Sequence, residues 1–164
     1  MGTNNVVIGV LVVMWLVKRQ LSPRTVKETE PYRLMVILAA VGAWQIASYV
    51  EDIHVPTAAW ELLVLSFGIG VVLAYVRGAL VHVWRDGDVL MRQGNAVTLT
   101  LWIASIALHI GSDLLIEQTS PGLDQLGRVS LLLYLAVAIG VQRVATLRKA
   151  ARLSLVASRN PAAG

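Results

Sequence analysis

One apolar stretch, residues 96–116, carries a row of side chains capable of chemistry. Thr98, Trp102, Ser105, His109 and Asp113 follow one another at intervals of three or four residues. In a helix this spacing puts all five on one face, which we expect to point into a helical bundle. A His with a carboxylate one turn away is suited to proton relay or metal binding, because the carboxylate fixes the imidazole tautomer and raises its basicity.

Three further groups lie near the same expected end of the molecule. Asp52, His54 and Glu61 surround the break between two apolar runs. Together with His109 and Asp113 they form a candidate metal or proton site at an extracytoplasmic mouth. Ionisable groups inside a membrane cost free energy, so each such group is a candidate for function. The alternative is structural: the His–Asp pair joins helices by hydrogen bonds, and the acids are solvated helix ends.

Several classes of chemistry have no basis in the sequence. The chain has no cysteine, which excludes disulfides, thiolate metal sites and a Cys nucleophile. It also lacks a nucleophile–base pair, a phosphate loop and a dinucleotide fingerprint. A b-type haem needs two His at matching depth, whereas His54 and His82 fall in expected loops. We therefore predict no cofactor, with haem or a metal ion as the alternative, and disfavour an enzyme.

The elements that must position these residues are membrane helices. Of the 164 residues, 56% are hydrophobic and only 15% are charged, which is outside the range of an ordinary soluble domain. The net charge of +4 does not indicate nucleic acid, because the Lys and Arg residues lie beside apolar segments, where they orient membrane helices.

Apolar runs long enough to cross a bilayer, which takes about 20 residues, define the fold class. We predict an all-α integral membrane protein: a five-helix transmembrane bundle over residues 1–150, followed by a basic cytoplasmic tail, 151–164. Lys18 and Arg19 follow the first run instead of preceding it, so that run is a retained span and not a signal peptide. The predicted spans are 3–17, 32–50, 60–76, 96–116 and 126–147.

The loop charges predict the topology. Thirteen of the 14 Lys and Arg residues, all except Arg128, fall in the loops, tail and span ends of one side. The positive-inside rule then places the N-terminus outside and the C-terminus in the cytoplasm. Ser120 and Pro121 are expected to begin the fifth helix as N-cap and first-turn residue.

The connector between the third and fourth spans has a pattern of its own. Apolar and polar residues alternate on both sides of Asp86-Gly87, which predicts a short cytoplasmic β-hairpin over about residues 80–93. The hairpin is either a connector that enforces topology or a docking element. Its candidate partner contacts are Trp84, Arg85, Gly87 and Arg92.

The same connector resembles a known family. The stretch VRGALVHVWRDGDVLMRQG, followed by an apolar span starting NAVTLTLWIASIAL, is similar to the CcdC-like group of small multi-pass bacterial membrane proteins (domain of unknown function 1453). The sharp part of the likeness is Val76 to Leu101. The resemblance implies a protein of the bacterial plasma membrane and supplies no catalytic residues.

Small residues recur every fourth position in two spans. Such spacing lets helices approach closely, and it predicts tight packing of the second span against the third, with homodimerisation as the alternative use. The stripe of the third span is Ser66, Gly70, Ala74 and Gly78, and that of the second is Ala39, Ala43 and Ala47.

Two functions follow from these patterns. The first is a non-enzymatic accessory or assembly factor that binds other membrane components through the hairpin and the basic tail. The alternative is a small transporter, or a protein that handles protons or metal ions through the His and carboxylate residues of the outer leaflet. The lipid bilayer is the partner common to both.

Overall fold

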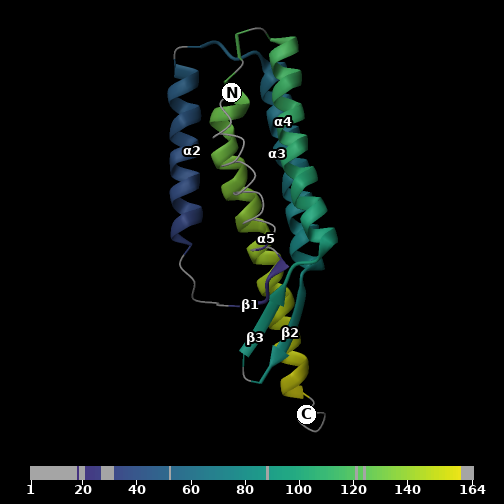
Figure 1. The fold of residues 1–164 in the computed structure, drawn as a ribbon. Helices are drawn as coiled ribbons and strands as arrows, with labels where there is room; N and C mark the ends of the chain where they lie inside the picture. The colour runs from purple at the N-terminus through teal and green to yellow at the C-terminus, as the bar shows by residue number, and fades with distance from the viewer. Residues whose placement is uncertain are drawn as a thin grey trace.

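The computed structural model describes residues 18, 21–26, 32–51, 53–87, 89–120, 122–123 and 125–159. Within them the chain forms four helices and a small sheet (Figure 1). The predicted first span, 3–17, lies outside the described residues, so the five-helix count rests on the sequence alone.

The four described helices coincide with the second to fifth predicted spans. They are α2 (Arg33–Glu51), α3 (Thr57–Leu80), α4 (Ala96–Thr119) and α5 (Leu126–Arg159). Three segments are long and apolar enough to cross a membrane: Thr57–Leu80, Ala96–Thr119 and Leu126–Leu153 of α5. In α2 the apolar part is shorter, Met35–Glu51.

Helix α5 is the element on which the bundle is assembled. It contacts α2, α3 and α4, while α3 also packs along α4. Glycines allow the close approaches: a Cβ on Gly42 would meet the backbone of Leu133, and a Cβ on Gly78 would lie 2.5 Å from the carbonyl oxygen of Gln142. The backbones of α2 and α3 therefore come close to α5.

The sheet lies at one end of the bundle. Strands β1 (Arg24–Thr25), β2 (His82–Asp86) and β3 (Val89–Gln93) form an antiparallel sheet in the order β1-β3-β2. The turn between β2 and β3 contains Gly87 at φ +58°, which glycine adopts without steric cost. The predicted hairpin is confirmed, and the sheet gains a third strand that the sequence did not indicate.

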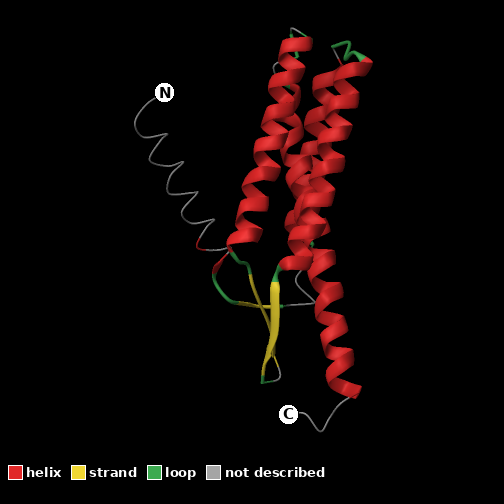
Figure 2. Cartoon of the chain, turned by 90° about the vertical axis from the view of Figure 1, so that its right-hand side faces the viewer, coloured by secondary structure: helices red, strands yellow, loops and turns green. Residues whose placement is uncertain are grey.

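The last helix continues beyond the bundle alongside this sheet (Figure 2). Val81, Val83 and Ala150 form a buried apolar cluster between them. Lys149 Nζ donates to the carbonyl oxygens of Ala79 and Val81, at 2.9 and 2.7 Å. A lysine thereby satisfies carbonyls at the end of α3, where a cation also suits the helix dipole. The first nine residues of the predicted tail are thus helical.

Helix α4 begins with a capping box and ends where the sequence predicted the next helix to start. Asn95 Oδ1 accepts from the backbone N–H of Thr98, and Thr98 Oγ1 accepts from that of Asn95, both at 2.8 Å. Ser120 is the C-cap of α4, with its N–H donating to Ile116, and α5 starts only at Leu126. The prediction of Ser120 as an N-cap was therefore wrong.

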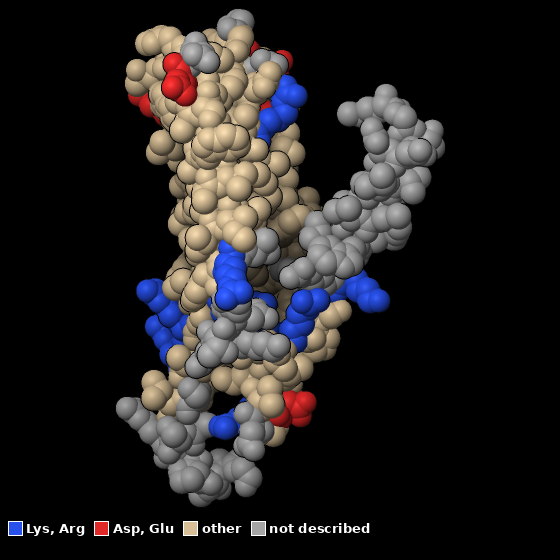
Figure 3. Space-filling view, turned by 90° about the vertical axis from the view of Figure 1, so that its left-hand side faces the viewer, with Lys and Arg blue, Asp and Glu red and all other residues tan. Residues whose placement is uncertain are grey.

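Charge divides along the molecule. Figure 3 shows Lys and Arg gathered around the end that carries the sheet, Asp and Glu mostly at the opposite end, and a broad uncharged belt between them. Large apolar side chains are exposed on the helices, with Trp44 at 69%, Val64 at 67% and Val72 at 60%. A soluble monomer rarely exposes so much apolar surface.

Candidate functional site

The polar face of α4 lies inside the bundle. Thr98, Ser105 and His109 are all buried there, and Asp113 is half-buried one turn further on. Trp102, on the same face, is also half-buried. The spacing of these residues therefore identified which side of the helix faces the other helices.

His109 is the centre of a hydrogen-bonded group that joins three helices. Its imidazole Nδ1 lies 3.1 Å from Ser66 Oγ on α3, and its Nε2 lies 3.3 Å from the carbonyl oxygen of Gly127 on α5. A carbonyl only accepts, so Nε2 carries the hydrogen and Nδ1 accepts from the Ser66 hydroxyl. Ser130 Oγ lies 3.4 Å from Nε2 and donates to the same carbonyl. Both ring nitrogens of the neutral imidazole are satisfied.

Aromatic rings enclose the same imidazole. Tyr134 stacks on His109 with ring centroids 4.3 Å apart and planes 16° apart, and Phe67 meets both rings edge-on. The Tyr134 hydroxyl donates to the backbone carbonyl of Ser105 at 2.7 Å and lies 2.6 Å from Ser105 Oγ. His109 is only 2% exposed. The cluster is a filled polar core, which we call the His109 cluster: Ser66, Phe67, Ser105, His109, Gly127, Ser130 and Tyr134.

Asp113 acts on α5 and not on His109. Its Oδ1 accepts from the backbone N–H of Gly127 at 2.9 Å, in the first turn of α5. A carboxylate suits a helix N-terminus, whose first N–H groups lack partners within the helix. A Cβ at position 127 would collide with the Asp113 carboxyl group, so glycine allows the carboxylate to approach this closely. The two predicted partners meet at Gly127, with His109 on its carbonyl and Asp113 on its N–H.

The other described members of the predicted outer site are not enclosed with His109. His54 and Glu61 are exposed, whereas His109 is enclosed. Asp52 lies outside the described residues. Across the described part of the chain, no group of three or more His, Asp or Glu side chains is arranged to hold a metal ion.

The predicted contact residues of the hairpin differ in exposure. Arg85 and Gly87 are exposed, and Arg85 Nε donates to the carbonyl of Gly87 at 3.1 Å, which ties the side chain to the turn. Trp84 is half-buried and stacks on the exposed ring of His82, with centroids 5.3 Å apart. Arg92 is half-buried on β3 and is paired in register with Arg24 of β1.

The stripe of small residues in α3 is used within the chain. All four members are buried. A Cβ on Gly70 would lie 2.5 Å from the ring of Tyr134, and one on Gly78 would be 2.6 Å from Ala145 Cβ. Both neighbours belong to α5, so the prediction that this stripe packs against α2 was wrong. The small residues of α2 also serve contact with α5, through Gly42.

Two buried residues escaped the sequence analysis. Arg77 was counted as a loop cation, but it lies in the last turn of α3, is 1% exposed, and its Nε has no hydrogen-bond partner in the described part of the chain. The sequence carried one signal for this position: the apolar run continues past Val76 with the residues GAL, which indicates that the helix extends beyond Arg77. Tyr134 was missed because it lies in a long apolar helix and nothing in its spacing distinguishes it from the apolar residues around it.

The comparisons with known proteins give no relative. No protein-family model, curated protein or solved structure matches the chain.

Proposed function

We propose that this protein is a non-enzymatic accessory or assembly factor of a bacterial plasma membrane, which binds another membrane component at its sheet end. The three apolar helices and the exposed apolar belt support a membrane location. Five spans, with residues 3–17 as the first, would put the N-terminus outside and the sheet in the cytoplasm. The resemblance of Val76–Leu101 to the CcdC-like group agrees with a bacterial membrane.

One observation carries the proposal: the hairpin is fastened to the bundle. A two-stranded hairpin alone is marginal in water, yet here β1 adds a third strand and α5 supplies the apolar cluster at Val81, Val83 and Ala150. A segment that only connected α3 to α4 would need neither the third strand nor the apolar cluster. We name the three strands together with residues 149–159 of α5 the sheet platform.

The exposed chemistry of the sheet platform suits a protein partner. The stacked rings of His82 and Trp84 offer an aromatic surface on one face of the hairpin, and Arg85 and Arg152 are exposed cations elsewhere in the platform. Aromatic residues and arginine are the residue types that most often dominate binding at protein interfaces. The partner should therefore present an apolar patch with acidic groups around it.

The alternative, proton or metal handling by His109, has less support. Both imidazole nitrogens already have partners in the neutral state, and the ring is enclosed by Tyr134 and Phe67. A transport site needs ligand groups that are open to a path. The geometry favours a structural role for this cluster.

Site-specific photo-crosslinking in cells tests the proposal. A photoreactive amino acid at Val89, exposed on β3, should yield one crosslinked partner, and the same amino acid at Gln118, exposed at the opposite end of α4, should not. Gly87→Pro should abolish the crosslink, because proline cannot adopt φ +58°. Equal crosslinking from both positions, or none from Val89, would contradict it.

A further inference from the structure

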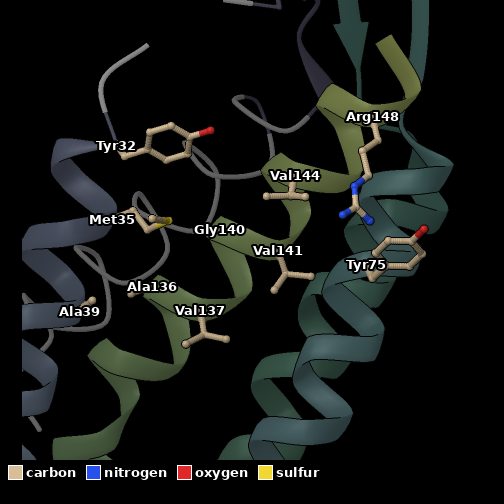
Figure 4. A pocket seen from close by; sticks show the side chains of 10 residues that line it. All are labelled: Tyr32, Met35, Ala39, Tyr75, Ala136, Val137, Gly140, Val141, Val144 and Arg148. Carbon is tan, nitrogen blue, oxygen red and sulfur yellow. The ribbon is translucent and has the colours of Figure 1, made fainter. Parts of the chain in front are cut away.

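A groove runs along the bundle where α2 and α3 stand apart. Both helices pack on α5, and a face of α5 is left bare between them. The part nearer the sheet is a cavity of about 480 Å³ with walls from all three helices, among them Met35, Tyr75 and Val141 (Figure 4). Beyond it a second cavity of about 410 Å³ lies between α2 and α3, with Leu133 of α5 in its wall.

The groove nearer the sheet is apolar along its length and polar at one end. Val137, Gly140 and Val141 of α5 line its floor, and Arg148 closes it at the end nearest the sheet, where the guanidinium extends toward Tyr75. Tyr32 lines the same end on the α2 side. This division suits a molecule with a long apolar part and an anionic head.

One cation at that end, Arg148, is available to an anion. Arg148 is exposed and has no hydrogen-bond or ion-pair partner among the described residues. Arg143, one turn earlier on α5, is held with its guanidinium 4.6 Å above the ring of Tyr32. A guanidinium binds phosphate oxygens with paired N–H donors, so an anionic head at this end would find the donors of Arg148 available.

The dimensions match one leaflet of a membrane. From Val137 to Arg148 a helix rises about 17 Å, at about 1.5 Å per residue, while a hydrocarbon core is about 30 Å thick. Arg148 precedes Lys149, which binds the carbonyls at the end of α3, so it lies level with the end of that apolar helix. The groove therefore spans roughly half the core, with its cation at the interface.

We propose that this groove binds one anionic phospholipid of the leaflet on the sheet side, with an acyl chain along Val137, Gly140 and Val141 and the phosphate at Arg148. The site is independent of the sheet platform. The competing occupant is the chain's own apolar segment 3–17, which is long enough to lie in such a groove.

Native mass spectrometry of the full chain released from bilayers tests the proposal. Nanodiscs would contain equal amounts of phosphatidylglycerol and phosphatidylcholine. The wild-type protein should retain one phosphatidylglycerol with at least about a tenfold preference, which corresponds to about 1.4 kcal/mol. Both lipids carry a phosphate, but the quaternary ammonium of phosphatidylcholine neutralises its headgroup and is repelled by Arg148, whereas phosphatidylglycerol has a net negative charge. Arg148→Gln should reduce the preference several-fold, whereas Arg152→Gln, an exposed cation one turn further along α5, should leave it unchanged.

A second variant and a crosslink separate the two occupants. Val141→Phe fills the groove and should reduce retention of both lipids; if that variant does not fold, the Arg148 and Arg152 pair still decides. Because the chain has no native cysteine, a Met14→Cys, Val141→Cys double variant reports the competing segment cleanly, and it should not form a disulfide in native membranes. Equal retention of the two lipids, equal effects of the two Arg variants, or quantitative disulfide formation would overturn the proposal.

Discussion

The imidazole of His109 and the carboxylate of Asp113 bind the same residue from two sides. His109 Nε2 donates to the carbonyl oxygen of Gly127, and Asp113 Oδ1 accepts from its N–H. Two residues one turn apart on α4 thereby fix the first turn of α5, the helix that contacts the three other described helices. A pattern that resembles a proton relay serves here as an interhelical fastening.

His109→Ala should destabilise the bundle. The change leaves Ser66 and the Gly127 carbonyl without their imidazole partner and opens a cavity beneath Tyr134, which together cost about 2–4 kcal/mol. The free energy of unfolding in mild detergent is the measurement. His54→Ala, at an exposed position, is the matched control and should leave the unfolding midpoint unchanged. If the stability of His109→Ala is unchanged, His109 does not have the structural role assigned to it.

Gly127→Ala should be strongly unfavourable. The added Cβ would occupy the position of the Asp113 carboxyl group, so the carboxylate must give up its bond to the helix N-terminus; overpacking of this kind costs about 1–3 kcal/mol. Gly111→Ala on α4 is the control, since a Cβ there meets nothing within 4 Å, and it should be neutral or slightly stabilising. Similar melting temperatures for the two variants would contradict the geometry.

A second pair of glycines tests the packing of α3 on α5. Gly70→Ala should lower the unfolding midpoint because its Cβ would meet the ring of Tyr134 at 2.5 Å, whereas Gly68→Ala, on the open side of the same helix, should not. If the stripe instead bound a second copy of the chain, Gly70→Ala would change the oligomeric state at unchanged thermal stability. Light scattering and thermal unfolding on the same samples distinguish the two results.

The attachment of the sheet platform depends on Lys149. Lys149→Met removes the ammonium that donates to the Ala79 and Val81 carbonyls and should raise amide hydrogen exchange in β2 and β3 several-fold, because the end of α3 loses its cap. Arg152→Gln removes the same charge from an exposed position and should leave exchange unchanged. An equal response of both variants would mean that net charge, not the bonds, controls the platform.

Periodicity predicted the elements well where the signal was local. Long apolar runs identified four helices, and Asp86-Gly87 identified the hairpin, since each depends on neighbouring residues. Strand β1 was missed because two residues, Arg24 and Thr25, carry no pattern and pair with β3 across a long stretch of chain. Long-range partners are not encoded in local spacing.

The candidate site shows the same difference between local patterns, which were predictable, and long-range partners, which were not. The face of α4 was predictable from spacing, but the choice of partner was not: His109 and Asp113 each bind α5 instead of one another. Arg77 was misjudged because a cation after an apolar run normally marks a membrane boundary. Here the helix continues for another turn, which takes the guanidinium into the bundle.

The membrane crossing and its direction are tested most directly by single-cysteine labelling in intact cells, since the chain has no native cysteine. Val89→Cys and Gln118→Cys place thiols at exposed positions at opposite ends of the bundle. A membrane-impermeant maleimide should label the cysteine at 118 in intact cells and the cysteine at 89 only after the membrane is permeabilised. Labelling of the cysteine at 89 in intact cells would contradict a cytoplasmic sheet platform.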